Sequence, residues 1–210
     1  MLDYHYMREK LLNQELVLHS ANHPLYKTRL KNMATRKAAV LIAFMQGGHD
    51  IQDGHDIQSD GEDRLLLTVR SKNLTHHAGQ ISFPGGRMDE DDMDAIHTAK
   101  RETFEEIGHP SDQIEIWGHL PSFVTGTGYE IFPVMGGLLP PFSFTCNPKE
   151  VAELFYLPLS YALELKNYHE ESYAMQGVNY RLPVLDWQGR HIWGATASML
   201  HAMAKMAHSA

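Results

Sequence analysis

The sequence predicts an α/β fold, because apolar runs with the length of strands alternate with helical patterns. The longest uninterrupted apolar run covers residues 38–45, and a continuous run of this length is typical of a strand buried on both faces. Residues 94–107 have apolar side chains at helical spacing and are followed by Gly108 and Pro110, which is a usual way for an amphipathic helix to end. We therefore expect a sheet with at least one helix packed against it.

The first third of the chain is expected to contain one helix and a pair of strands. Residues 4–19 are weakly periodic in apolar residues, which predicts a helix. Residues 64–69 form a second apolar run, which we expect to pair with residues 38–45 as a hairpin. The segment between them, residues 47–63, repeats Gly-His-Asp-Ile-Gln and is interpreted as a mobile loop rather than a rigid metal site.

The remainder of the chain predicts further strands and two more helices. Pro84, Gly85 and Gly86 are expected to form a turn in which the backbone can approach a ligand closely. Residues 166–178 are polar and show no readable pattern. The other elements are expected as strands at 80–83, 114–120, 129–138 and 153–157, a short helix at 159–165, a hairpin of 180–187 with 191–193, and a last helix from 195 with Ala195, Met199, Ala202, Met203 and Met206 facing the core.

Length, charge and cysteine content limit the classes of protein that this chain can represent. At 210 residues with 43% hydrophobic residues, we expect one globular domain. The apolar runs are far shorter than the roughly 20 residues of a membrane span, and the net charge of −8 disfavours binding to nucleic acid. A single cysteine, Cys146, excludes an intrachain disulfide and fits a reducing, cytoplasmic environment. The sequence leaves the oligomeric state open.

Three carboxylates are concentrated near the end of the predicted helix at 94–107. At about 100° per residue, Glu102, Glu105 and Glu106 share one helix face. Like charges at this spacing destabilise a helix by roughly 0.2–0.5 kcal/mol per pair, so we expect a cation to neutralise them. Hard oxygen ligands without cysteine indicate Mg²⁺ or Mn²⁺ rather than zinc. The alternative reading is a solvated acidic face of the helix.

Neighbouring residues support a metal site at this helix face. Arg101 precedes Glu105 by four residues and is expected to pair with it and fix its rotamer. Gly108 ends the helix directly after the carboxylates. The acidic run at 89–94 suits the helix N-terminus, where it complements the helix dipole. Four residues are expected on a neighbouring arc that packs into the core: Ile96, Ala99, Thr103 and Ile107.

The segment at 85–108, GGRMDEDDMDAIHTAKRETFEEIG, resembles the Nudix box, G-x5-E-x7-R-E-U-x-E-E-x-G-U, where U is a bulky aliphatic residue. The half that begins at Arg101 agrees closely. The first half departs, because Gly86-x5-Asp92-x8-Arg is one residue longer and has Asp in place of Glu. Read with the pattern L-L-T-V-R-S-x-x-L-x-x-H-x-G-Q-x-x-F-P-G-G at 66–86, this departure is similar to the coenzyme A pyrophosphatase branch of the Nudix hydrolases.

The resemblance implies a fold and a reaction. The fold would be an α/β/α sandwich with a mixed β-sheet, formed by a single Nudix hydrolase domain over residues 1–210 with a helical extension at about 1–36. The reaction would be hydrolysis of a nucleoside diphosphate linked to another moiety. A pyrophosphate bridge carries negative charge, and a bound metal neutralises that charge while it activates water.

The resemblance also implies roles for the residues of the box. Glu102 and Glu106 would be the principal metal ligands, since they lie one helical turn apart and point the same way. Glu105 would be a further ligand or an orienting group, with Arg101 as its ion-pair partner. Gly86 would offer its backbone carbonyl to a metal.

Three residues outside the box complete the expected site, each with an alternative reading. Glu150 is our candidate outside the box for the base that deprotonates water, although a glutamate of the box is also a candidate; otherwise Glu150 is a surface residue that begins a strand. Arg70 is expected to contact a phosphate, or else to brace the loop by an ion pair. His77 either contacts the substrate or fixes its loop by a hydrogen bond.

The sequence therefore predicts hydrolysis of coenzyme A or its derivatives, dependent on Mg²⁺ or Mn²⁺, to 3′,5′-ADP and the 4′-phosphopantetheine portion. One alternative is a Nudix hydrolase that acts on another nucleotide, such as ADP-ribose, a dinucleoside or a deoxynucleoside triphosphate. A more distant alternative is a Nudix domain without catalytic activity that binds a nucleotide or a partner. The presence of all three box glutamates disfavours this last alternative.

Overall fold

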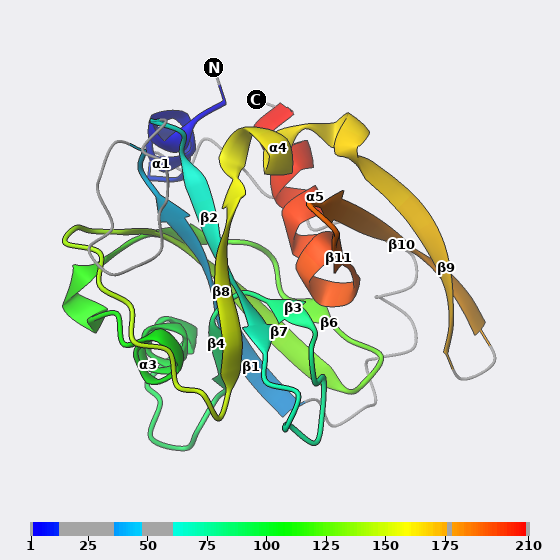
Figure 1. Cartoon of the computed structure of the whole chain (residues 1–210), viewed down its shortest axis with the longest axis horizontal. Coiled ribbons are helices and arrows are strands. Elements are labelled where there is room, and N and C mark those ends of the chain that lie inside the picture. The colour runs from blue at the N-terminus through cyan, green and yellow to red at the C-terminus, as the bar shows by residue number, and fades with distance from the viewer. Residues whose placement is uncertain (1, 13–35, 48–60, 176–177, 209–210) are drawn as a thin grey trace.

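The computed structural model describes residues 2–12, 36–47, 61–175 and 178–208 (Figure 1). The first half contains α1 (Tyr4–Leu12), β1 (Arg36–Met45), β2 (Arg64–Arg70), β3 (Ile81–Ser82), β4 (Gly85–Arg87) and α3 (Ala95–Ile107). A short 3-10 turn leads to β5 (Ile114–His119), β6 (Phe123–Val124), β7 (Tyr129–Leu138) and β8 (Val151–Pro158). The chain then forms α4 (Leu159–Leu163), β9 (Tyr168–Met175), β10 (Val178–Trp187), β11 (Arg190–Ile192) and α5 (Gly194–His208).

Eight of the described strands form one mixed sheet, with the order β3-β2-β1-β7-β5. β8 also pairs with β2, β4 with β1, and β6 with β7. β1 and β7 run parallel, whereas the other pairs in this sheet are antiparallel. The predicted buried strand at 38–45 and its pairing with residues 64–69 are confirmed, since β1 is buried from residue 38 onward and pairs with β2.

Helices cover both faces of this sheet. The even-numbered residues 40–44 of β1 belong to a core that includes α1, α4 and α5, whereas the odd-numbered residues 39–45 belong to a second core with α3. Figure 1 shows α3 on one side of the strands and α5 on the other. Because successive side chains of a strand point to opposite faces, one fully apolar strand supports two helical layers. The predicted α/β/α sandwich is confirmed.

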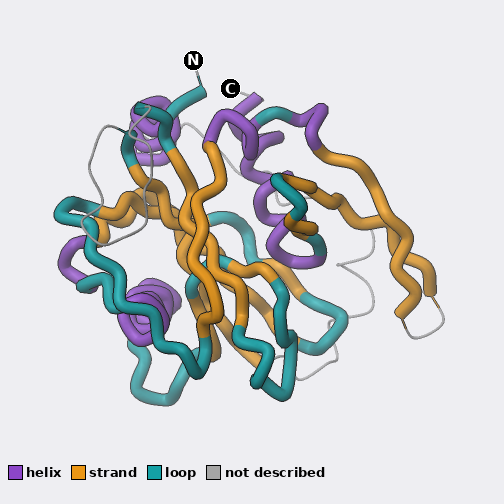
Figure 2. The backbone as a smooth tube through the Cα atoms, viewed as in Figure 1, coloured by secondary structure: helices purple, strands orange, loops and turns teal. Residues whose placement is uncertain are grey.

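A second, three-stranded sheet contains β9, β10 and β11 and extends beside α5 (Figure 2). The predicted hairpin is confirmed: β10 and β11 pair across Gln188 and Gly189, both with positive φ, as tight hairpin turns require. The strand β9 was not predicted from the sequence. It pairs along its length with β10, so its structure depends on a partner rather than on an apolar pattern of its own.

Several local predictions need correction. Gly85 and Gly86 do not form a turn but belong to β4, which pairs antiparallel with β1. Ile96 is exposed, although the other three residues predicted on its arc are buried. In α5 the three predicted methionines are buried, whereas Ala195 and Ala202 are only partly so.

Two predictions fall partly outside the described residues. The helix predicted at 4–19 is present as α1 as far as Leu12, and its remaining residues lie outside the description. Most of the loop predicted at 47–63 also lies there. Among the residues that the structure describes, no helix is long and apolar enough to cross a membrane.

Candidate active site

The helix α3 begins and ends where its sequence predicts. The side chain of Asp94 accepts a hydrogen bond from the backbone N–H of His97 at 2.8 Å and caps the first turn. Gly108 adopts a left-handed conformation with φ of 73°, and its N–H donates to the Phe104 carbonyl, a typical C-terminal cap. These two caps define where the last turn of α3, with its glutamates, lies.

The glutamates of α3 differ strongly in burial. The side chain of Glu106 is 2% exposed and that of Glu102 is 13% exposed, whereas that of Glu105 is 49% exposed. Burial raises the pKa of Glu106 to about 8 and also raises the pKa of Glu102, because an apolar surrounding disfavours the ionised carboxylate. The helix therefore presents one buried carboxylate, Glu106, one partly buried, Glu102, and one exposed, Glu105.

Glu150 adds a third carboxylate from outside the helix. This residue lies directly before β8, and one oxygen each from Glu102, Glu106 and Glu150 lies within 4.8 Å of the others. The charge of Glu150 further raises the pKa of both helix glutamates. The structure thus brings Glu150 to Glu102 and Glu106, and it leaves Glu105 outside this group. We call these three residues the carboxylate cluster.

Two glycines of β4 make room for the cluster. The backbone N–H of Gly85 donates to Oε2 of Glu106 at 3.3 Å. A Cβ atom on Gly86 would lie 2.5 Å from the carboxylate of Glu102, which no side chain could tolerate without a shift. The backbone of β4 is therefore in direct contact with the carboxylates of Glu102 and Glu106. The sequence pointed to Gly86 but not to the Gly85 N–H as a hydrogen-bond donor.

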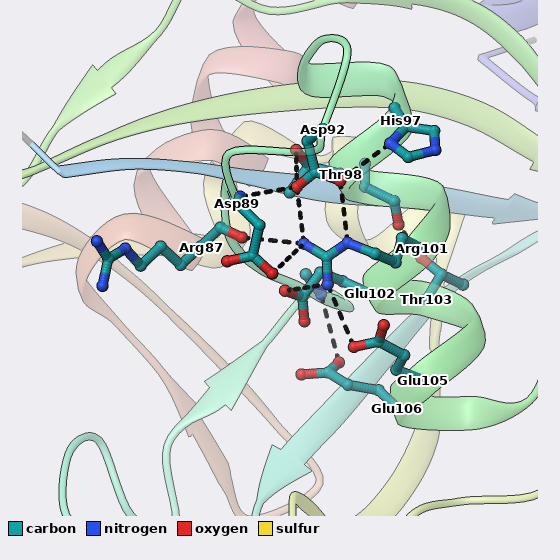
Figure 3. A network of polar contacts seen from close by, with 12 residues as sticks. Arg87, Asp89, Asp92, His97, Thr98, Arg101, Glu102, Thr103, Glu105 and Glu106 are labelled. Carbon is teal, nitrogen blue, oxygen red and sulfur yellow. Dashed lines mark hydrogen bonds and ion pairs between the residues drawn. The ribbon is translucent and has the colours of Figure 1, made fainter.

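Arg101 is the centre of a polar network beside the cluster (Figure 3). Its Nε and Nη2 donate to the two oxygens of Asp92 at 3.0 and 2.8 Å, and its Nη1 donates to Glu102 at 3.0 Å. The predicted pair with Glu105 is present at 3.2 Å, but Glu105 is not the principal partner. The bidentate bond to Asp92 lowers the pKa of Asp92 and raises the pKa of Arg101.

Asp92 holds the loop that precedes α3. Its side chain, 2% exposed, also accepts hydrogen bonds from the hydroxyl of Thr98 and from the backbone N–H of Asp89, each at 2.9 Å. The ring of His97 contacts the same carboxylate. The shorter Asp and the additional residue in this half of the box therefore produce a closed loop that positions Arg101.

Arg70 reaches the cluster from the end of β2. Its Nη1 lies 3.7 Å from Oε1 of Glu106, and its side chain is 28% exposed. The Nε atom of Arg70 is buried without a hydrogen-bond partner in the described structure. The ion pair that the structure gives to Arg70 joins it to Glu106 of α3, whereas the predicted alternative was an ion pair that braces its loop.

His77 lies in an exposed loop and contacts Gln80. Its backbone has a φ of 58°, and its Nδ1 lies 2.7 Å from Oε1 of Gln80. The loop-fixing reading of His77 matches this contact.

The donor atoms of the cluster fit a hard divalent cation. The three carboxylates meet two guanidinium groups, that of Arg101 at 3.0 Å from Glu102 and that of Arg70 at 3.7 Å from Glu106, and Glu106 is buried with a raised pKa. Buried carboxylates are unfavourable unless a charge compensates them. Oxygen donors of this kind suit Mg²⁺ or Mn²⁺.

Comparisons with known proteins show the family of this chain. The family model described as NUDIX domain matches residues 57–175. An uncharacterised Nudix hydrolase, NudL, of Yersinia pestis (strain Pestoides F) is 33% identical over 200 residues, covering 95% of this chain and 94% of that protein. A solved structure of a C. elegans Ap4A hydrolase binary complex matches 59% of this chain and 80% of its own at 20% identity, with a TM-score of 0.46. The chain belongs to the Nudix family and is a Nudix hydrolase.

Proposed function

We propose that the protein hydrolyses the pyrophosphate bond of coenzyme A or its derivatives and releases 3′,5′-ADP and 4′-phosphopantetheine, or its acyl form. The main support is the position of the segment at 66–86, whose pattern resembles the coenzyme A branch. This segment contributes Arg70, Gly85 and Gly86 directly to the surroundings of Glu102 and Glu106. The segment whose pattern suggests the substrate therefore lies beside the glutamates that suggest metal-dependent hydrolysis.

We infer that Glu102, Glu106 and Glu150 hold Mg²⁺ or Mn²⁺, together with the carbonyl of Gly86. When bound, such a cation would neutralise the pyrophosphate and lower the pKa of water. Glu105 is outside the cluster, so its role would be that of a further ligand recruited with substrate or of an orienting group. Four carboxylates provide more oxygen donors than one ion requires, which allows for more than one ion.

The side chains around the cluster would bind the substrate, position the metal ligands or fix a loop. Arg70 would exchange its long contact with Glu106 for a phosphate oxygen of the substrate, and its buried Nε is a second donor. Arg101 would keep Glu102 in place from the opposite side. His77 would fix the loop after β2 rather than contact the substrate.

Proton transfer is assigned to Glu150. A carboxylate oxygen of Glu150 would accept a proton from water, whose oxygen forms a bond to one phosphorus atom. The bond from that phosphorus to the bridging oxygen breaks, and the bridging oxygen leaves with the other phosphate. Glu150 is suited to this role because it lies on a loop rather than on α3, with a carboxylate oxygen within 4.8 Å of those of Glu102 and Glu106. The box glutamates are the alternative bases.

A product analysis tests the substrate. Full-length protein with Mn²⁺ would be incubated with coenzyme A, its disulfide, an acyl-coenzyme A, ADP-ribose, a dinucleoside polyphosphate and a deoxynucleoside triphosphate at equal concentrations. We expect 3′,5′-ADP and the phosphopantetheine product in equal amounts, with kcat/KM at least about tenfold above that for ADP-ribose, which is about 1.4 kcal/mol of discrimination. Equal or faster hydrolysis of ADP-ribose would reject coenzyme A as the substrate.

We further infer that residues 1–210 act as one Nudix domain, with α1 as part of a helical extension, in the cytoplasm. The contacts of α1 with the core around β5 support a single domain that includes α1. The single cysteine supports the cytoplasmic location, because the chain does not depend on an oxidising compartment for an internal disulfide.

A further inference from the structure

The loop before β8 is joined to the end of α3 by backbone hydrogen bonds. The N–H of Thr145 donates to the carbonyl of Ile107, and the N–H of Asn147 donates to the carbonyl of Glu106, both at 2.8 Å. These carbonyls are among the last of the helix and have no acceptor role within it. The position of Asn147 is therefore set by the same residue that supplies a buried carboxylate to the cluster.

The side chain of Asn147 continues this connection to Glu150. Its Nδ2 donates to Oε1 of Glu150 at 3.1 Å, while its Oδ1 accepts from the backbone N–H of Lys149 at 3.2 Å. The amide is thus oriented by one contact and directs a donor at the carboxylate with the other. An amide donates without adding a positive charge, so this contact leaves the charge of Glu150 in the cluster.

The backbone of Glu150 is held on both sides. Its N–H donates to the carbonyl of Asn147 at 3.0 Å, and its carbonyl accepts from the N–H of Ser71 at 2.7 Å. Ser71 directly follows Arg70, the residue that contacts Glu106. The main chain of Glu150 is therefore fixed between α3 and β2, and the Asn147 amide is the contact that restrains its side chain.

We propose that Asn147 is a positioning residue that directs the carboxylate of Glu150 into the cluster. Three carboxylates within 4.8 Å repel one another, and Glu150 is the member on a loop. Without the Nδ2 donor, its side chain would rotate away from Glu102 and Glu106. This inference rests on the proposed role of Glu150 in metal-dependent hydrolysis.

A double-mutant cycle tests whether Asn147 acts through Glu150. We expect Asn147→Ala to lower kcat about tenfold with KM for coenzyme A nearly unchanged, since a hydrogen bond to a charged group contributes on this scale. In a Glu150→Gln background, the same substitution should have no further effect on kcat. Equal losses in both backgrounds, or no loss in the wild-type background, would overturn the proposal.

A second measurement does not depend on turnover. Mn²⁺ binding, followed by the loss of the free-ion electron paramagnetic resonance signal, should weaken several-fold in Asn147→Ala. The matched control is Asn167→Ala, which removes an amide bonded to the Tyr161 carbonyl at 3.0 Å in another loop and should bind Mn²⁺ like the wild type. Unchanged Mn²⁺ affinity in Asn147→Ala would count against the proposal even if that variant were less active.

The two proposals fail in different ways. If the wild-type protein does not hydrolyse coenzyme A, the proposed substrate is wrong, and the cycle can be repeated with whichever nucleotide is hydrolysed. If the wild type is active and Asn147→Ala retains full kcat and Mn²⁺ affinity, only the positioning role is wrong. Thermal unfolding of each variant separates loss of folding from loss of positioning.

Discussion

Two regions of the molecule contain clusters of ionisable side chains, and the two clusters differ in burial. In the carboxylate cluster, Glu106 is 2% exposed and three carboxylates meet two arginine contacts, at 3.0 Å to Glu102 and 3.7 Å to Glu106. On the three-stranded sheet, His169 and His191 pair with Glu171 and Asp186, and all four side chains are 41–56% exposed. We call these four residues the outer charged cluster.

The two clusters differ in the effect of their surroundings on ionisation. Burial raises the pKa of Glu106 to about 8, whereas hydrogen bonds from His169 and Tyr173 lower the pKa of Glu171. The buried surroundings of Glu106 disfavour its ionised carboxylate. The exposed carboxylate of Glu171 is instead stabilised by hydrogen bonds from neighbouring side chains. A carboxylate whose pKa is strongly raised by burial beside other carboxylates marks a candidate functional site, and the number of charged residues alone does not.

The largest expected effect is that of Glu106→Gln. The amide preserves shape and keeps one oxygen that can accept from the Gly85 N–H, but it removes the negative charge of a ligand, so kcat should fall about a thousandfold, which is about 4 kcal/mol. Glu105→Gln, at the exposed end of the same helix face, should lose only about tenfold. Steady-state kinetics with circular dichroism of both variants makes the comparison. Full activity in Glu106→Gln, or equal losses in the two variants, would show that burial does not distinguish the glutamates that catalysis needs.

An intermediate effect is expected for Asp92→Asn. The variant loses the bidentate bond to Arg101, which should reduce kcat about tenfold and lower the free energy of unfolding by about 2 kcal/mol at neutral pH. Asp89→Asn, whose side chain is 67% exposed and 3.7 Å from Arg101, is the matched control and should be nearly neutral.

The pH dependence of this effect follows from the lowered pKa of Asp92. A carboxylate with a lower pKa in the folded state than in the unfolded state stabilises the fold above the unfolded pKa, about 3.9 for aspartate, and loses that contribution as the pH falls below it. Thermal unfolding from pH 7 to pH 2 should therefore show a constant difference between the wild type and Asp92→Asn down to about pH 4, and a narrowing difference below it. A difference that stays constant down to pH 2 would contradict the assignment.

The smallest effect is expected in the outer charged cluster. Glu171→Gln removes the negative charge and one of the two oxygens that contact His169 and Tyr173 at 3.2 and 3.0 Å, but its exposed position allows water to replace the lost contact. We expect kcat to change less than about twofold and the unfolding midpoint to stay within the error of calorimetry. A loss of activity comparable to that of Asp92→Asn would show that the outer charged cluster takes part in function.

Much of the fold could be predicted because it depends on local patterns. The run that became β1 is apolar at every position from 38 to 45, and such a strand must be covered on both faces. The start and end of α3 follow from Asp94 and Gly108, whose side chain and conformation act within one helical turn. The strand β9 could not be predicted, because its backbone is satisfied by β10 and not by its own side chains.

The sequence by itself determined which residues are the candidates for the chemistry: the glutamates of the box, the glycine pair and Arg70. It could do so because residue type and helical spacing decide what can ligate a cation. Only the tertiary structure decided which carboxylates meet. It placed Glu150, distant in sequence, against Glu102 and Glu106, and it left Glu105 near water, since burial and distance between segments depend on how the sheet and α3 pack together.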